Sequence, residues 1–203
     1  MPVTIRRLVT GHESNGKADV ALDGPPPRTD VFQCIPGMVS RLVWATASPA
    51  IVPVEGSDPT LSVSSITPAP GETRFLVVTF PPYSVFAAPD FDPIAAGKEN
   101  LALNPGLAER FEPDGMHTTD TVDYGIVLDG EIWLELDDGR QRPLRTHDVI
   151  VQNGTRHAWR NKSDRAATLA FILIGARRER VPNPSDPTGR MQTITTVNDR
   201  NFR

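Results

Sequence analysis

The second half of the chain consists mainly of short apolar segments separated by turn residues. Asp129-Gly130 lies between two of these segments, and Asp137-Asp138-Gly139 follows the second, as in antiparallel hairpins. The segments that we expect to form strands are YGIVL (124–128), EIWLEL (131–136), DVIVQ (148–152), HAWRN (157–161) and ATLAFILIG (167–175). Short strands at this spacing predict an all-β domain, folded as a sandwich or a closed barrel.

The first half contains further strand candidates and one segment of different character. TRFLVVTF (73–80) predicts a strand that ends at two prolines, and residues 3–10 and 37–48 also predict strands. The Pro- and Ser-rich residues 49–72 are expected to be loop, or short strands such as LSVSSI. Residues 90–112 contain an Asp-Pro pair near their start and apolar residues at roughly helical spacing, which predicts a short helical insert.

Length and composition limit the domain organisation and the partners. A chain of 203 residues fits one domain with extensions, which we divide into an N-terminal arm with strands (1–48), a barrel (49–176) and a C-terminal tail (177–203). No apolar run reaches the length of about 18 residues that a membrane span needs, so no membrane is expected. Cys34 is the single cysteine and the N-terminus lacks an apolar leader, which favours a cytoplasmic location. The net charge of −4 and the scattered arginines argue against nucleic-acid binding.

Two segments carry the residues that point to chemistry. GMHTTDTVDYGIVLDGEIWLEL (115–136) holds His117, Thr119 and Asp123. Even numbers separate these three residues, so in unbroken β-structure their side chains share one face. HDVIVQNGTRHAWRN (147–161) adds His157, which a barrel brings round to the same interior.

These two segments resemble the two motifs of the cupin superfamily. Many cupins present His-x-His on one strand, an acid four residues after the second His, and a glycine turn seven residues after the acid. His117 matches the first His, Asp123 stands where Glu is usual, and Gly130 falls at the turn. Thr119 stands where the second His is usual.

The second cupin motif is a Gly-x-x-His followed by an Asn four residues later, which Gly154, His157 and Asn161 match. His147 replaces a glycine that usually precedes the Asp of this motif, and the usual proline before Gly154 is absent. The resemblance implies a cupin-type β-barrel, or jelly roll, with an N-terminal strand arm and the short helical insert. It also implies a homodimer that forms through that arm.

The resemblance further implies a divalent transition metal, Fe, Mn, Zn or Ni, held by His117, Asp123 and His157. Asp123 is alternatively a proton carrier, because an interior carboxylate often has a raised pKa. We expect Asp123 and His157 to be catalytic, and Thr119, Arg156 and Trp159 to contact a small-molecule substrate.

Cupins include dioxygenases, decarboxylases, dehydratases, isomerases and binding proteins without enzymatic activity. We expect a metal-dependent lyase that acts on a small oxygenated organic molecule by decarboxylation or dehydration. The alternatives are an Fe(II)-dependent dioxygenase and, because Thr119 is a poor ligand, a metal-free enzyme or a small-molecule binding protein.

Overall fold

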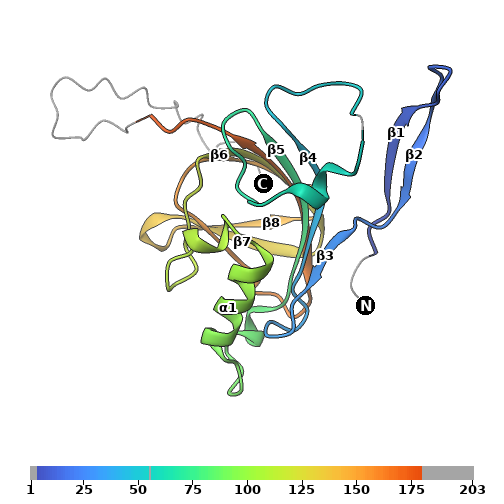
Figure 1. Cartoon of the computed structure of the whole chain (residues 1–203). Coiled ribbons are helices and arrows are strands. Elements are labelled where there is room, and N and C mark those ends of the chain that lie inside the picture. Colours follow the sequence, from blue (N-terminus) through green and yellow to red (C-terminus); the bar gives the residue numbers. More distant parts are fainter. Residues whose placement is uncertain (1–3, 55, 180–203) are drawn as a thin grey trace, which may run out of the picture.

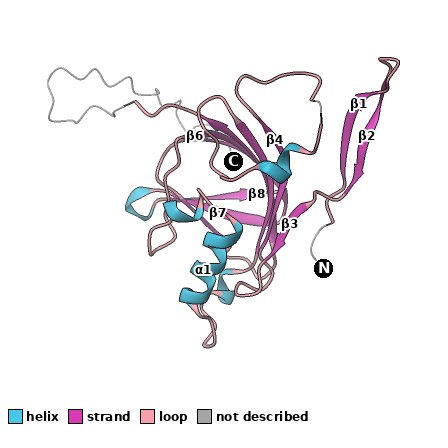
Figure 2. Cartoon of the chain, viewed as in Figure 1, coloured by secondary structure: helices cyan, strands magenta, loops and turns pink. Residues whose placement is uncertain are grey.

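The computed structural model describes residues 4–54 and 56–179, in which antiparallel strands form three sheets beside one α-helix (Figures 1 and 2). This confirms the all-β prediction. The largest sheet has the strand order β3-β4-β5-β11-β6-β9, the second β10-β7-β8, and the third is the hairpin β1-β2. The strands are β1 (Arg7–His12), β2 (Ala18–Gly24), β3 (Arg28–Val31), β4 (Val39–Thr46), β5 (Thr73–Phe80), β6 (Thr121–Asp129), β7 (Glu131–Glu135), β8 (Gln141–Arg145), β9 (Val149–Asn153), β10 (Ala158–Arg160) and β11 (Ala167–Gly175).

The main hydrophobic core joins the six-stranded sheet to the three-stranded sheet. Leu76 of β5 and Leu169 of β11 pack in one cluster with Ile132 of β7, and each is at most 3% exposed. Residues alternate along β6, where Asp123 and Val127 are buried and Tyr124 is half exposed. This alternation is the two-residue period read from the sequence.

The predicted turn between β6 and β7 is confirmed at Gly130. Its φ of 87° lies in the left-handed region, and a Cβ there would come within 2.8 Å of the Ala167 Cα. Only glycine combines that backbone conformation with such a close approach.

The helical insert forms α1 (Pro93–Leu103), followed by a 3₁₀ turn, η3 (Ala108–Arg110). The Asp92 carboxylate accepts hydrogen bonds from the amides of Ile94 and Ala95 at 2.9 and 3.0 Å, which fixes the start of the helix. Ala96 packs against Phe32 and Ile35 in the loop between β3 and β4, and Leu103 at the end of α1 packs on the same cluster, so the helix is held against the barrel along its length (Figure 1).

The range 1–48 that was predicted as an arm contains two different structures. The hairpin β1-β2 projects from the barrel, whereas β3 and β4 pair within the six-stranded sheet (Figure 1). At the hairpin base, Arg7 forms a 2.6 Å ion pair with Asp58, and both side chains are less than one tenth exposed. Leu8 and Leu22 of the hairpin are exposed, and the homodimer expected through this arm stays a prediction.

Several sequence expectations differ from the structure in detail. The segment LSVSSI forms no strand, because it holds the end of a 3₁₀ turn, η1 (Pro59–Ser62), and irregular loop. The sequence reading did not identify β2, β3 or β8 as strands. Residues 1–3 of the first predicted strand and 180–203 of the predicted tail lie outside the described residues.

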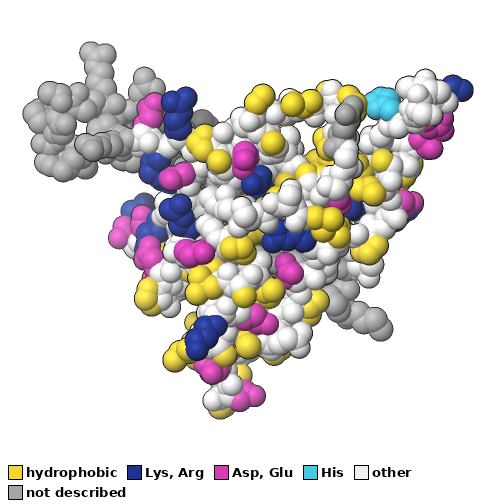
Figure 3. Space-filling model, viewed as in Figure 1, with side chains coloured by type: hydrophobic (Ala, Val, Ile, Leu, Met, Phe, Trp, Pro, Cys, Tyr) yellow, Lys and Arg dark blue, Asp and Glu magenta, His cyan; other side chains and the backbone are white. Residues whose placement is uncertain are grey.

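In the described part of the chain, no helix is long and apolar enough to cross a membrane. Acidic and basic side chains are interspersed over the face shown in Figure 3, and this face shows no stripe of one sign.

Candidate functional site

A cavity of about 500 Å³ lies between the two larger sheets and is covered by α1. Most of its lining is apolar and comes from the six-stranded sheet, the helical insert and β10. Residues of this apolar lining include Leu76, Val78, Phe80, Phe111, Phe171 and Leu173. His117, Thr119, Asp123, His157 and Trp159, which the sequence singles out, also line this one cavity.

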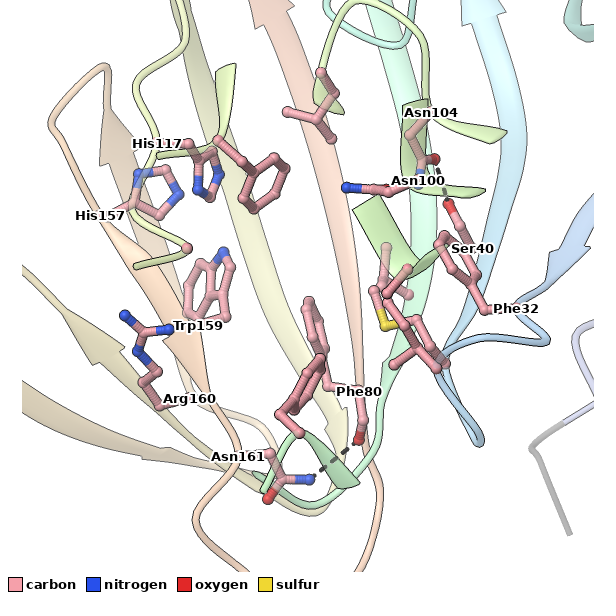
Figure 4. A pocket seen from close by; sticks show the side chains of 18 of the residues that line it. Phe32, Ser40, Phe80, Asn100, Asn104, His117, His157, Trp159, Arg160 and Asn161 are labelled. Carbon is pink, nitrogen blue, oxygen red and sulfur yellow. Dashed lines mark hydrogen bonds between the residues drawn. The ribbon is translucent and has the colours of Figure 1, made fainter. Parts of the chain in front are cut away.

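His117 and His157 face each other on one wall of the cavity (Figure 4). Their backbones form an isolated antiparallel bridge, with amide-to-carbonyl distances of 2.8 and 3.0 Å in the two directions. The bridge places the two imidazoles with ring centroids 4.2 Å apart, and Phe111 stacks on the far side of His117 at 4.4 Å. The pair is therefore set by backbone hydrogen bonds rather than by a shared strand.

The turn before His157 explains one glycine of the motif. Gly154 has φ of 61°, a left-handed conformation that favours glycine, and it follows directly after β9. The chain reverses there and returns to the cavity wall at His157.

The environment of His157 selects one tautomer. Nδ1 lies 2.9 Å from the Thr155 carbonyl oxygen, which only accepts hydrogen bonds, so Nδ1 carries the proton. The amide nitrogen of Gln152 lies 3.0 Å from the same Nδ1, and both of its hydrogens have acceptors on Thr155. Nε2 of His157 therefore carries the free lone pair.

Both imidazoles are neutral at pH 7. Burial, with the repulsion of His157, lowers the pKa of His117 to about 3. Burial also lowers the pKa of His157, against the opposing effect of its hydrogen bond to Thr155. The Nδ1 atom of His117 is buried and has no hydrogen-bond partner among the described residues.

Asp123 is the buried acid of the cavity. Burial raises its pKa to about 6, and a hydrogen bond with the Thr121 side chain acts in the opposite direction. The Thr119 hydroxyl lies 2.8 Å from the Thr121 hydroxyl, so polar groups follow the inner face of β6 as far as Asp123. Asp123 Oδ1 has no partner in the described part of the chain.

The predicted metal centre requires the two histidines and Asp123 to converge. Within residues 4–54 and 56–179, no three His, Cys, Asp or Glu side chains gather so that they could hold a metal ion. His117 and His157 meet, but Asp123 does not complete a group of three with them. The residues present do not fit the predicted ligand set, and the chemistry proposed below uses the side chains alone.

Arg156 and Trp159 occupy different places. Trp159 lines the cavity, and its ring lies 5.7 Å from that of His157. Arg156 is not part of the lining, because its guanidinium pairs with the carboxylates of Glu112, Asp114 and Asp137. The arginine at the cavity wall is Arg160, which the sequence analysis did not single out.

Similarity to known proteins covers most of the chain. The Phomopsin biosynthesis cluster protein C' of Diaporthe leptostromiformis is 31% identical over 181 residues, which span 86% of this chain and 80% of that protein. The Cupin-domain-containing oxidoreductase virC of Hypocrea virens (strain Gv29-8 / FGSC 10586) is 48% identical over 46 residues, or 23% of this chain and 24% of that protein. The chain belongs to the cupin superfamily. No family model matches the sequence.

Among solved structures, the Schizosaccharomyces pombe Cnp3 Cupin Domain aligns with this cupin at a TM-score of 0.42 and 10% identity. The alignment covers 84% of this chain and 87% of that chain.

Two positions of the second cupin motif, one that departs from the family pattern and one that matches it, have a visible structural setting. His147 stands at a usual glycine position and keeps a positive φ of 77°. Asn161 donates from Nδ2 to the carbonyl oxygens of Phe80 and Arg165 at 3.1 and 2.8 Å, so it ties the end of β10 to β5 (Figure 4). The motif Asn therefore supports the barrel wall.

Sequence reasoning missed several polar residues of the cavity. Gln152 is an inward-facing residue near the end of β9, but Val149, Ile150 and Val151 before it are all apolar, so the sequence shows no alternation that marks it. Arg160, Asn100 and Asn104 also line the cavity. No spacing rule identifies the two asparagines, because they belong to the helical insert and reach the cavity only through the tertiary fold.

Proposed function

We propose that this cupin is an enzyme that moves a proton on a small, largely apolar organic molecule, in a lyase-type reaction such as dehydration or decarboxylation. The observation that carries the proposal is the pair of neutral imidazoles, 4.2 Å apart, on the wall of a mainly apolar cavity. Similarity to a biosynthesis cluster protein and to a protein named as an oxidoreductase supports an enzyme-like role.

The roles follow from the hydrogen bonds and the burial. His157 Nε2 is the base, because Thr155 holds the proton on Nδ1 and the apolar surroundings keep the ring neutral. Asp123 is the acid, since a pKa of about 6 lies close to the working range of pH. His117 stacks between Phe111 and His157 and orients the base.

In a dehydration, His157 takes the proton from the carbon beside a carbonyl group. The electron pair of that C–H bond forms the new carbon–carbon double bond, and the C–O bond of the β-hydroxyl breaks. Asp123 supplies the proton with which the hydroxyl leaves as water, and the proton on His157 then returns to Asp123 through solvent.

The test is a panel of β-hydroxy ketones and β-keto acids with aryl or alkyl tails. Absorbance of the conjugated ketone reports dehydration, and CO2 release reports decarboxylation. We expect turnover by the wild-type protein and a loss of about 100-fold or more in His157→Gln. His12→Gln is the matched control, because His12 is exposed on the projecting hairpin. Wild-type turnover in His157→Gln would place the base elsewhere, and no turnover on the whole panel would count against a lyase.

An oxidoreductase is the second candidate, favoured by the similarity to the Hypocrea virens protein, which is named as a cupin-domain-containing oxidoreductase. The Fe(II)-dependent dioxygenase expected as an alternative belongs to this class. Measuring product formation with added Fe(II), in air and under nitrogen, separates the two. O2 uptake that matches product formation, with no product under nitrogen, would replace the lyase proposal. Ligand binding without turnover in either atmosphere would indicate a binding protein.

A further inference from the structure

We propose that Asn100 is a second anchoring point of the cavity, opposite the imidazoles. The substrate is then an elongated apolar molecule with a neutral hydrogen-bond acceptor, such as a carbonyl oxygen, at the end remote from His117 and His157. This inference rests on the proposed function, because it takes the imidazole wall as the reacting end.

A row of polar side chains crosses the wall that faces the histidines (Figure 4). The Ser40 hydroxyl of β4 donates to Asn104 Oδ1 at 3.2 Å, and Asn104 Nδ2 donates to Asn100 Oδ1 at 2.9 Å. Ser40 and Asn104 are each only 5% exposed, whereas Asn100 is half-buried at the cavity surface. Neither of the two cupin motifs contains these residues.

The order of donors and acceptors fixes what Asn100 offers to a ligand. A hydroxyl that donates to Asn104 Oδ1 leaves Asn104 Nδ2 as the donor towards Asn100. The side-chain oxygen of Asn100 is therefore occupied, and its NH2 group points into the cavity (Figure 4). No acceptor among the described residues takes its two hydrogens.

The chemistry of the bound molecule follows from the two walls. His157 Nε2 accepts a hydrogen bond from a ligand hydroxyl, and the Asn100 NH2 group donates one to a ligand carbonyl. Between them the lining is aromatic and aliphatic, with Phe80, Phe111 and Phe171. A ligand that displaces water from the Asn100 NH2 group without offering an acceptor leaves this donor unpaired, and its affinity falls.

The probes are two pairs of phenols that differ in one carbonyl group and in length. They are para-hydroxyacetophenone with para-ethylphenol, and para-hydroxybenzylacetone with para-butylphenol. Calorimetric titration gives the Kd of each. In the wild-type protein we expect at least one ketone to bind about fivefold tighter than its carbonyl-free partner, the ratio that one net hydrogen bond contributes.

Asn100→Leu should reduce that ratio to about one without weakening the carbonyl-free phenols. Asn100→Asp keeps the size of the side chain but cannot donate when ionised, and it serves if the leucine variant does not fold. The matched control is Lys98→Leu, which introduces the same residue at an exposed position of α1. We expect it to keep the wild-type ratio.

The outcomes separate the two proposals. A ratio near one in the wild-type protein, or an unchanged ratio in both Asn100 variants, overturns the role of Asn100 while leaving the proposed function open to its own test. The ratio of Kd values within a phenol pair can depend on Asn100 while His157→Phe leaves phenol binding unchanged. In that case Asn100 remains an anchoring point, but the proposed function loses its support, because the phenol hydroxyl then does not bind at His157. If none of the four phenols binds, the inference fails.

Discussion

The neutral imidazole of His117 predicts that acid destabilises the folded protein, and the buried His157 acts in the same direction. Its pKa in the folded state is about 3, against 6.5 for an exposed histidine. Below pH 6.5 the unfolded chain binds a proton at this site and the folded protein does not, so stability from His117 is present above this pH and is lost as the pH falls.

The magnitude follows from the linkage. Each pH unit between the two pKa values changes the free energy of unfolding by about 1.4 kcal/mol. Lowering the pH from 7 to 5 therefore costs the folded state about 2 kcal/mol through His117. Because pH 5 lies well above the folded-state pKa, this figure depends mainly on the unfolded-state value. Asp123 acts in the opposite direction, since its raised pKa of about 6 stabilises the folded state as the pH falls through that value.

The measurement must therefore isolate His117 from Asp123. His117→Phe keeps a ring next to Phe111 and removes the titrating group, and urea unfolding at pH 7 and pH 5 gives the stability of both proteins. We expect the stability of wild type relative to His117→Phe to fall by about 2 kcal/mol on acidification, because the contributions of Asp123 and His157 are common to both. His12→Gln, on the exposed hairpin, is the control variant and should follow the wild type. If wild type and His117→Phe lose the same amount of stability between pH 7 and pH 5, His117 binds a proton in the folded state. That result would refute the neutral pair of imidazoles at His117 and His157.

Three further predictions concern other parts of the molecule. Asp58→Asn should lower the free energy of unfolding by about 3 kcal/mol in urea titrations, because the substitution leaves Arg7 buried without its carboxylate partner. Asp23→Asn, in the exposed pair with Arg6, is the control and should change the free energy of unfolding little. Thr119→His should retain Zn²⁺ or Ni²⁺ against a chelator better than wild type, because it adds a third imidazole to the cavity wall. Thr118→His is the control, because Thr118 lies outside the cavity lining, and it should not retain the metal better than wild type. Equal metal loss in the two variants would contradict the placement of Thr119 in the cavity. For the expected homodimer, Leu22→Lys on the hairpin should shift sedimentation towards the monomer, and an unchanged sedimentation profile would remove the hairpin from the interface.

The sequence by itself determined the features that depend on neighbouring residues. The alternation of buried Asp123 and Val127 with half-exposed Tyr124 follows from the two-residue period of a strand. The turn at Gly130 follows from the Asp129-Gly130 pair, because glycine tolerates the positive φ that the turn requires. The start of α1 was readable because Asp92 caps the amides directly after it. These are local constraints, and they also placed the two motif segments on strands or beside them.

The tertiary structure alone decided which groups meet in the cavity. The backbone bridge between His117 and His157 sets the 4.2 Å imidazole pair, and the burial that neutralises both rings comes from many distant segments. Asp123 lines the same cavity as His117 and His157. In the described part of the chain it does not form a metal-binding group with these two histidines, although its position in the cupin motif predicted such a group. The contact between Ser40 and Asn104 joins residues 64 positions apart. No local period encodes such a contact, because it depends on how β4 and the helical insert pack together, and that packing decides what the second wall of the cavity offers to a ligand.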